Sequence, residues 1–332
     1  MIRQILTVNE GSSSLKYSLY EEDHCVWHKN MPRQKNAKDL ILKEIKGLKK
    51  PLNAIGHRIV FGGSEFPAPV LIDDEVIGKL RKLSRFAPLH MPDEITLIEH
   101  LRRYFPDVAQ VACFDTSFHQ SLPPRAYLFP LPQSLQDEGV RKHGFHGISF
   151  ESIVDQVKPV PENMIVGHLG SGVSLAAIKN GISVDTTMGL TPLGGVAMGT
   201  RPGDLDPGIL LYLLQERGYS PDELEHILYF ESGLKGLSGQ TSDMKTLLKE
   251  NTEMSKQAID IFCYQIAKVI GAYRVVLGGL DALIFTGGIG EHCPEILDRI
   301  CHYLKGIPVP QVFPSQEEKI IAKHTRQIIS KH

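Results

Sequence analysis

The sequence has few cysteines and no excess of charge of either sign. Five cysteines are scattered along 332 residues, at Cys25, Cys113, Cys263, Cys293 and Cys301, and none lies in a Cys-x-x-Cys pair. An odd, scattered set argues against a disulfide framework and against a structural zinc site. The 36 Lys and Arg residues nearly balance the 38 Asp and Glu residues, leaving a formal net charge of −2. The basic excess typical of nucleic-acid-binding proteins is missing, so we expect no nucleic-acid partner.

Long hydrophobic runs are missing as well. The first nine residues, MIRQILTVN, become polar too early to contain the apolar core of a signal peptide. The most apolar stretch, residues 266–289, is interrupted by Lys268, Arg274 and Asp281, so no segment is predicted to span a membrane. We therefore expect a soluble, cytoplasmic protein.

Several familiar motifs are absent. The chain has no G-x-x-x-x-G-K-[ST], which excludes a P-loop kinase. It has no complete G-x-G-x-x-G after a first strand, which counts against a Rossmann dehydrogenase. No H-E-x-x-H or other close pair of metal ligands occurs, so magnesium carried by a nucleotide fits better than a protein-caged transition metal.

Strand and helix patterns alternate along the chain, which favours α/β layers around mixed sheets. A lysine-rich stretch, residues 29–50, is interpreted as a solvated helix face rather than a nucleic-acid patch. Capping boxes are expected at Ser220–Glu223 and Ser315–Glu318, and residues 287–290 are expected to form a turn. The strands are expected at residues 2–8, 15–20, 53–61, 108–114, 164–166, 173–178 and 280–286. The main helices are expected at residues 75–85, 92–104, 253–276, 294–304 and from 315 to about 330.

Two hairpins far apart in the sequence are similar. The strand–loop–strand around Asn9-Glu-Gly11 resembles the one around His168-Leu-Gly170. Either two ordinary hairpins coincide, or the chain contains a duplicated core with a ligand between the copies.

Three loops are suited to meeting phosphate. Gly11–Ser14 offers main-chain N–H groups and hydroxyls with Lys16 two residues later, and Gly170–Gly172 lets the main chain approach a ligand closely. Thr286–Glu291 places glycines between a strand and a helix start. Each loop alone is weak support, because most glycine-rich turns are only turns.

Charged side chains inside apolar segments mark candidate binding groups. Arg58 lies within a buried-type strand and Arg201 between glycines, where an arginine often grips an anion. Asp115 ends an apolar strand and would have to be paired or metal-linked if buried. In the segment Arg141–Gly147, His143 fits a structural role and His146 a functional one.

Seven segments together identify a family. In order and approximate spacing, the chain resembles the acetate kinase family from residue 2 to about 329. The matching segments are Asn9–Lys16, Gly56–Arg58, Ala87–His90, Phe114–Gln120, Gly144–Gly147, Met198–Arg201 and Phe285–Glu291. The resemblance implies an actin/sugar-kinase/Hsp70-type fold of two related α/β domains with a duplicated core and a central nucleotide cleft. The expected lobes are residues 1–147 with about 318–332, and about 148–317.

The resemblance also implies an activity. Members transfer the γ-phosphoryl group of ATP reversibly to acetate or a similar short carboxylate, giving an acyl phosphate and ADP. They use Mg²⁺, with Mn²⁺ as an alternative, and a homodimer is expected by the same analogy.

The resemblance assigns site residues by position. The catalytic set is Arg58, Asp115, His146 and Arg201, and the metal pair is Asn9 and Glu317. The carboxylate and its acyl group would meet Arg58, Val60, Leu89, Phe145 and Pro192. The nucleotide would meet Ser12, Ser14, Lys16, His168, Leu169, Gly170, Ser171, Gly172, Asp243, Met244, Lys245, Gly288, Ile289, Gly290, Glu291 and His292.

The chemistry agrees with this assignment. A carboxylic acid with a pKa of about 4 is already ionised at neutral pH, so no general base is needed to make it a nucleophile. The difficulty is to bring two anions together, which requires positive charge around the phosphoryl group. We therefore expect Asp115 to orient an arginine or the metal shell rather than to remove a proton.

The chain also departs from the family pattern. Ser171 stands where the family usually has Asn, Met244-Lys245 replaces Phe-Arg, and His292 replaces Asn. Glu10 and Phe61 also fall outside the common pattern, and the chain is shortened around residues 20–50 and 307–314. Two alternatives to an acetate kinase therefore stay open. One is a propionate or butyrate kinase of the same family, and the other is a catalytically impaired nucleotide-binding regulatory protein.

Overall fold

The computed structural model describes residues 4–11, 14–32, 37–48 and 50–331. The chain divides into two compact units, which are described separately. The first contains residues 1–120, 145–152 and 316–332, and the second contains residues 121–144 and 153–315. Among the described residues, no helix is both long and apolar enough to cross a lipid bilayer.

The first unit contains a six-stranded mixed sheet. Its order is β3-β2-β1-β4-β6-β5. The predicted first hairpin is confirmed as β1 (Gln4–Glu10) paired antiparallel with β2 (Ser14–Glu21). The strands β4 (Ala54–Ile59) and β6 (Ala109–Phe114) continue the sheet in parallel, and β5 (Val70–Leu71) closes one edge. The interpretation of residues 29–50 as helix was wrong at its start, because β3 (His24–Pro32) pairs with β2 before α1 (Ala37–Lys46) begins.

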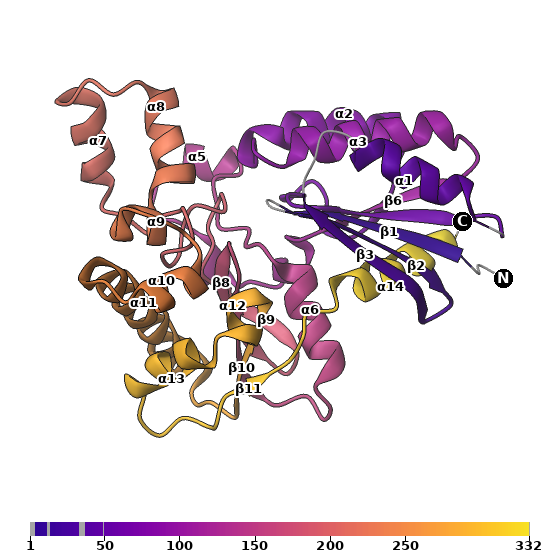
Figure 1. Cartoon of the computed structure of the whole chain (residues 1–332). Helices are drawn as coiled ribbons and strands as arrows, with labels where there is room; N and C mark the ends of the chain where they lie inside the picture. Colours follow the sequence, from indigo (N-terminus) through magenta and orange to yellow (C-terminus); the bar gives the residue numbers. More distant parts are fainter. Residues whose placement is uncertain (1–3, 12–13, 33–36, 49, 332) are drawn as a thin grey trace. The chain divides into compact units, whose positions relative to one another are not determined.

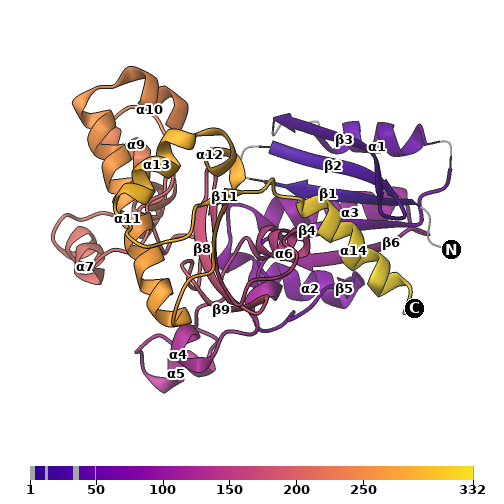
Figure 2. The same cartoon turned by 90° about the horizontal axis from the view of Figure 1, so that it is seen from below.

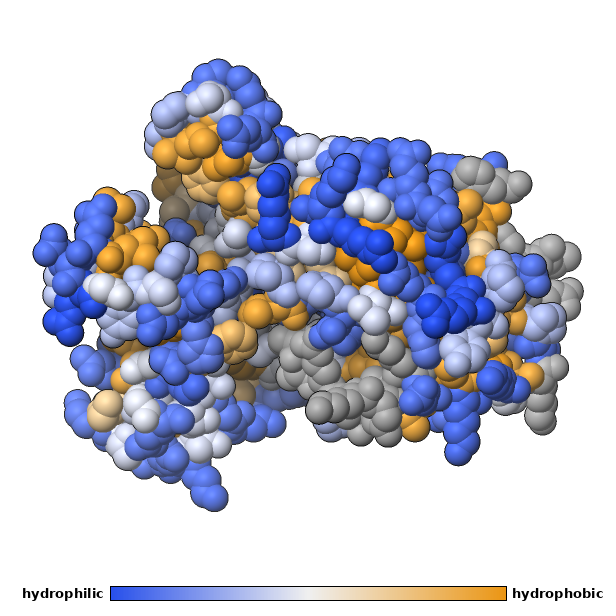
Figure 3. Space-filling view, turned by 90° about the horizontal axis from the view of Figure 1, so that it is seen from above, coloured by the Kyte–Doolittle hydropathy of each residue, from blue (hydrophilic) through white to orange (hydrophobic). Residues whose placement is uncertain are grey.

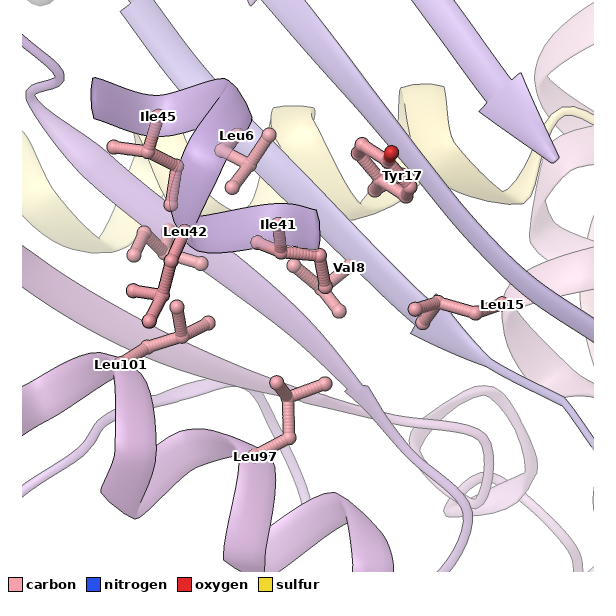
Figure 4. Packing of buried hydrophobic residues seen from close by; sticks show 10 residues of the cluster. Leu6, Val8, Leu15, Tyr17, Ile41, Leu42, Ile45, Leu97 and Leu101 are labelled. Carbon is pink, nitrogen blue, oxygen red and sulfur yellow. The ribbon is translucent and has the colours of Figure 1, made fainter. Parts of the chain in front are cut away.

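Helices cover both faces of this sheet (Figures 1 and 2). Leu6 and Val8 of β1 point to one face, where they pack against α1 and α3 (Met91–Tyr104), as Figure 4 shows. Ile5, Thr7 and Asn9 alternate with them, because successive side chains of a strand point to opposite faces. The C-terminal helix α14 (Glu317–Ile329) lies on that second face, where Ile5 packs against Ala322. The helix α2 (Asp74–Leu83) packs beside α3.

The second unit repeats the arrangement of the first sheet. Its order is β9-β8-β7-β10-β11, with β7 (Asn163–Leu169), β8 (Val173–Lys179) and β9 (Ile182–Thr186) antiparallel. The strands β10 (Ala282–Thr286) and β11 (Gln311–Val312) continue in parallel. The order β3-β2-β1-β4-β6 therefore matches β9-β8-β7-β10-β11 strand for strand in direction. The predicted duplicated core is confirmed.

Short helices connect and extend the second sheet. A π-helical turn at Ile227–Glu231 joins two of them. The longest helix, α11, confirms the expectation for residues 253–276. The helix α6 (Gly147–Gln156) begins in the first unit and ends in the second. The helices of the second unit are α4 (Pro124–Tyr127), α5 (Gln133–Asp137), α7 (Pro207–Gln215), α8 (Pro221–His226), α9 (Gly233–Ser238), α10 (Met244–Glu250), α11 (Glu253–Leu277), α12 (Gly287–His292) and α13 (Pro294–His302).

Two sequence-based expectations about helix starts differ from the structure. The capping box at Ser220–Glu223 is confirmed, but the one at Ser315–Glu318 is not formed. There, the N–H of Ser315 donates to Glu291 and that of Gln316 to Ser152, so other side chains satisfy these donors. Residues 287–290 are helical, as the start of α12, instead of a turn.

The unit boundary also differs from the expected one. Residues 121–144 belong to the second unit instead of the first. Ser121 Oγ donates to the main-chain oxygen of Ser183 at 2.8 Å, and Lys142 Nζ contacts Asp185 of β9 at 2.9 Å. These bonds tie the segment to the second sheet.

Candidate active site

Arg58 and Asp115 form a buried ion pair in the first unit. Because β4 and β6 are parallel, the carboxyl ends of both strands lie at the same sheet edge, where Arg58 and Asp115 are located. Arg58 Nε lies 3.1 Å from both Asp115 oxygens, and Nη2 lies 2.5 Å from Oδ2. Burial opposes the charge on Arg58, but the carboxylates of Asp115 and Glu317 hold the pKa of Arg58 above its usual range. The guanidinium is therefore a fixed cation.

Asn9, in β1, connects the C-terminal helix α14 to the corner of the first unit that holds Arg58 and Asp115. Its Nδ2 donates to Glu317 Oε2 at 2.6 Å and to Glu318 Oε1 at 3.0 Å, and all three side chains are buried. The structure thus brings together the two residues expected at the metal, and it adds Glu318. The sequence-based prediction did not include Glu318, because the resemblance assigned the metal role to Glu317 alone of the two adjacent glutamates.

The oxygen atoms at this corner suit a hard cation. Carboxylate and amide oxygens are the ligands that Mg²⁺ prefers, and Mg²⁺ usually takes only one or two carboxylates together with substrate phosphates. Asn9 Oδ1, 3.5 Å from Arg58 Nη1, and the carboxylate of Glu317 fit such a role. Within the described part of the chain, no cluster of three or more His, Cys, Asp or Glu could cage a metal by itself.

His146 occupies a strained position next to Asp115. Its φ is +57°, which is uncommon for a non-glycine residue. The main-chain N–H of His146 bonds to the Asp115 carboxylate, and Gly147 N donates to the Asp115 main-chain oxygen at 2.9 Å. A Cβ at Gly147 would lie 2.1 Å from that oxygen, so only glycine fits. The turn therefore fixes His146 against Asp115.

Three of the four residues expected to contact the acyl group lie in the first unit. Val60 and Phe145 are buried, and Leu89 is half-buried. The ring of Phe145 stacks on Phe61, with centroids 6.0 Å apart. The N–H of Val60 donates to Glu94 Oε2 at 3.2 Å. Glu94 was not anticipated, because an acidic residue in the first turn of a helix is ordinarily an exposed partner of the helix dipole.

Arg201 is a buried cation of the second unit. Only 9% of its surface is exposed, and its Nη1 donates to the main-chain oxygen of Pro192 at 2.9 Å. Burial lowers the pKa of Arg201 to about 10, and Tyr229 alone acts in the opposite direction. Among the described residues, no carboxylate forms an ion pair with it. A buried guanidinium without an acidic partner is suited to binding an anionic ligand.

The loop that carries Arg201 is held from two sides. Thr200 Oγ1 donates to the Tyr229 oxygen at 2.7 Å, and Leu234 N donates to the Met198 oxygen at 2.8 Å. Gly233, with φ +59°, lies so close that a Cβ would come within 2.2 Å of the Met198 oxygen. Tyr229 belongs to the π-helical turn, a local irregularity frequent at functional sites. No pattern in the sequence indicated it.

The expected nucleotide segments of the second unit partly converge. The loop of residues 168–172 joins β7 to β8, and a Cβ at Gly287 would lie 2.8 Å from the Leu169 oxygen, so α12 starts against this loop. This brings His168, Leu169, Gly170, Ser171 and Gly172 near Gly288, Ile289, Gly290, Glu291 and His292. The Ser171 oxygen accepts from Gly199 N at 3.1 Å, which connects the loop to the segment of Arg201.

The remaining nucleotide residues have visible structural roles. Asp243 is the N-cap of α10, with Oδ1 2.8 Å from Thr246 N, while Met244 is buried and Lys245 is exposed. In the first unit, Ser14 closes the hairpin turn through its main-chain oxygen, and Lys16 lies opposite Asn9 in register. Ser12 lies outside the described residues.

Comparisons with known proteins agree on one family. The model of the acetokinase family matches residues 28–331. A protein of Rhodopseudomonas palustris (strain TIE-1) named acetate kinase is 40% identical over 338 residues, covering 90% of this chain and 85% of the relative. The crystal structure of a propionate kinase from Francisella tularensis superposes with a TM-score of 0.88 at 33% identity, covering 98% and 100% of the two chains.

A more distant likeness concerns the fold alone. A ROK family glucokinase from Streptomyces griseus, in complex with glucose and AMPPNP, superposes with a TM-score of 0.50 at 14% identity. The match covers 98% of this chain and 99% of that one. This chain and that glucokinase thus have the same overall fold.

Proposed function

The chain belongs to the acetokinase family, and from this premise we propose that it transfers the γ-phosphoryl group of ATP to acetate, reversibly, giving acetyl phosphate and ADP. As a family member it is a phosphotransferase with a carboxylate acceptor. The observation that carries the proposal for acetate is Arg201, a buried guanidinium that no carboxylate of the described residues pairs with. Such a group binds an anion with charge-assisted hydrogen bonds.

The residues act by positioning and by neutralising charge. Acetate is already an anion at neutral pH, so the reaction needs no base to activate it. Arg58, fixed by Asp115, and Arg201 supply positive charge to the reacting anions. The main-chain bond from His146 keeps Asp115 in place, and the His146 side chain is a further candidate donor to the phosphoryl group. Asp115 then orients Arg58 and removes no proton.

Magnesium enters this proposal with the nucleotide. Asn9 and Glu317 would hold Mg²⁺, or Mn²⁺ in its place, with Glu318 fixing the Asn9 amide. The bound ion supplies positive charge that neutralises the phosphate oxygens. We assign the phosphates and adenosine of ATP or ADP to residues 168–172, 243–245 and 288–292 of the second unit, and to Ser12, Ser14 and Lys16 of the first.

The acyl group selects among short carboxylates. Val60, Leu89 and Phe145 leave an apolar environment for a methyl group, with Pro192 assigned to the same role. One methylene is worth about 1–3 kcal/mol in such a pocket, so propionate is the natural second substrate. The similarity to a propionate kinase favours this second candidate over butyrate.

The assembly proposed is a cytoplasmic homodimer. The helix α7 has no buried residue, and it exposes Ile209, Leu211, Tyr212 and Leu214. Figure 3 shows hydrophobic surface at its left, the side on which α7 lies in Figure 1. A second copy of the chain is the occupant that we propose for this helix. All five cysteines are free thiols, in keeping with a reducing compartment.

A hydroxylamine trap tests the proposed reaction. Purified protein is incubated with Mg-ATP, hydroxylamine and acetate, propionate or butyrate, and acyl hydroxamate is measured. Product with acetate at the highest kcat/KM supports the proposal, and a preference for propionate makes the second candidate correct. If no carboxylate gives product while ATP still binds, the chain is a nucleotide-binding regulatory protein instead. Reactions without ATP are the control.

The dimer is tested separately. Leu211→Glu with Tyr212→Glu places two charges on exposed positions of α7. Light scattering after size exclusion should report a dimer for the natural chain and a monomer for this variant. A monomer in both would overturn the dimer. Val276→Glu on α11, also an exposed apolar position, is the matched control.

A further inference from the structure

Glu94 is a buried carboxyl group that the reaction described above does not use. It lies in the first turn of α3, and only 3% of its surface is exposed. Its Oε2 accepts the N–H of Val60 at 3.2 Å. Its Oε1 is out of reach of solvent and has no hydrogen-bond partner among the described residues. A carboxylate in such surroundings is costly, whereas a neutral carboxylic acid is tolerated.

The charges around Glu94 do not offset the cost of burying its ionised form. Arg58 of β4 attracts a charge on Glu94, but its guanidinium is bound to Asp115, and Asp115 and Glu10 repel such a charge. Burial is the largest effect, and it raises the pKa of Glu94 to about 8. Glu94 therefore carries a proton at neutral pH.

Several charged side chains near α3 pair with groups other than Glu94, and His100 of α3 packs against the ring of Tyr104. At the N-cap of α3, the main-chain oxygen of His90 accepts the N–H of Glu94 at 3.1 Å. The charged side chains of α2 and α1 that meet α3 have partners at its exposed side. These pairs are Arg81 with Glu99, Asp74 with Arg102, and Lys46 with the ring of Tyr104.

We propose that Glu94 is a positioning residue, which fixes the main chain at Val60 and thereby the acyl side of the carboxylate site. This inference rests on the proposed function. Val60 follows Arg58 by two residues. The bond from Val60 N to Glu94 therefore fixes the main chain that carries both Arg58 and the apolar side chain of Val60. Ionisation of Glu94 would place a second carboxylate beside Arg58 and compete with Asp115 for it. Binding of acetate then weakens as Glu94 loses its proton.

Two variants separate this role from a merely structural one. Glu94→Gln keeps an oxygen that accepts from Val60 N but cannot ionise, and Glu94→Leu removes the acceptor. Glu99→Gln changes an acidic residue of the same helix that pairs with Arg81 near the surface, and it is the matched control. The readouts are KM for acetate and KM for ATP from about pH 7 to 9.

The proposal predicts that raising the pH increases KM for acetate but not KM for ATP. In the natural chain and in Glu99→Gln, KM for acetate should rise roughly tenfold between about pH 7 and pH 9, with KM for ATP unchanged. In Glu94→Gln, KM for acetate should stay within about threefold over this range. In Glu94→Leu it should rise at least about tenfold at pH 7. Two results would overturn the proposal. One is a rise of KM for acetate with pH in Glu94→Gln that equals the rise in the natural chain, and the other is an unchanged KM for acetate in Glu94→Leu.

Two measurements remain informative if the chain turns over no carboxylate. The infrared difference spectrum between the natural chain and Glu94→Gln at pH 7 should contain the C=O stretch of a protonated carboxylic acid. Hydrogen exchange at the Val60 amide should be slow in both of these proteins and fast in Glu94→Leu. A missing C=O band, or equal exchange in Glu94→Leu, refutes the role of Glu94 independently of the proposed reaction.

Discussion

Arg58 approaches Asp115 with the side of its guanidinium, through Nε and Nη2, and directs Nη1 toward the main-chain oxygen of Glu10 at 3.3 Å. Two of its three nitrogens are thus committed to one carboxylate. Arg201 is held differently, because its Nη1 donates to the main-chain oxygen of Pro192 and not to a carboxylate. The two arginines are therefore held by different means, and their replacement should have different consequences.

Asp115→Asn tests whether Asp115 orients Arg58 or acts as a base. The amide keeps the shape of the side chain but loses the charge that fixes the guanidinium. We expect kcat to fall roughly 100-fold, in line with the loss of one preorganised charge. The pH profile of the remaining activity should keep the shape of the natural one. A pH dependence that disappears in the variant would identify Asp115 as a proton acceptor instead.

Arg201→Ala should inactivate the enzyme without unfolding it. We expect a loss of about two or more decades in kcat, measured by the hydroxamate assay. Stability should be retained, because no carboxylate among the described residues loses a partner. Urea unfolding followed by circular dichroism checks this. Near-natural turnover in the variant would refute the site assignment.

Arg58→Ala is the contrasting case. It leaves Asp115 buried and without its cationic partner, and breaking a buried pair in this way typically costs about 3–5 kcal/mol. Both activity and the free energy of unfolding should therefore decrease. Equal stability of the Arg58 and Arg201 variants would contradict the difference in their surroundings.

Val60→Ala should widen the range of acyl groups. Removing two methyl carbons beside the substrate makes room for propionate, and the ratio of kcat/KM for propionate to that for acetate should rise about 10-fold. Val111→Ala removes the same atoms from β6 in the core cluster that includes Ile320 and Ile321, so it should lower stability without changing this ratio. The same shift in both variants would show that specificity follows stability and not the pocket.

Acid should destabilise the chain through His57. Burial lowers the pKa of His57 to about 4, and its Nε2 bonds to Gln110 Oε1 at 2.8 Å. The unfolded chain binds a proton below about pH 6.5 and the folded chain only near pH 4, so stability falls as pH drops through this window. The expected loss is on the order of 3 kcal/mol. Urea unfolding at both ends of the window should show a smaller loss for His57→Gln, and an equal loss would exclude His57.

Local patterns in the sequence predicted the parts of the fold that depend on neighbouring residues. The hairpins of β1–β2 and β7–β8 follow from apolar strands that flank short loops, and their similarity indicated the duplicated core. The capping box at Ser220 depends on residues three apart and was equally visible. In contrast, β3 is formed only by pairing with β2, so its end at Lys29–Pro32 was interpreted as part of the lysine-rich helix that follows.

The candidate site was predictable where it followed the family motifs and not where it depends on the tertiary fold. Arg58 and Asp115 stood out as charges in apolar strands. Glu94 and Tyr229 gave no such signal, because what distinguishes them is burial against Val60 and beside Arg201. Ordinary helix-start and aromatic residues have the same appearance in a sequence.

The bond from Asn9 to Glu317 joins residues 308 positions apart in the chain. Protein synthesis proceeds at about 5–20 residues per second, so Glu317 is added roughly 15–60 s after Asn9. Throughout that interval the first sheet lacks α14, and Ile5 lacks its contact with Ala322. The nascent chain thus exposes the apolar side chains of this sheet face, Ile5 and Tyr20 among them, until α14 is made. A ribosome-bound chaperone that covers this face should increase the yield of folded protein, and a stall before residue 317 should leave a chain that aggregates.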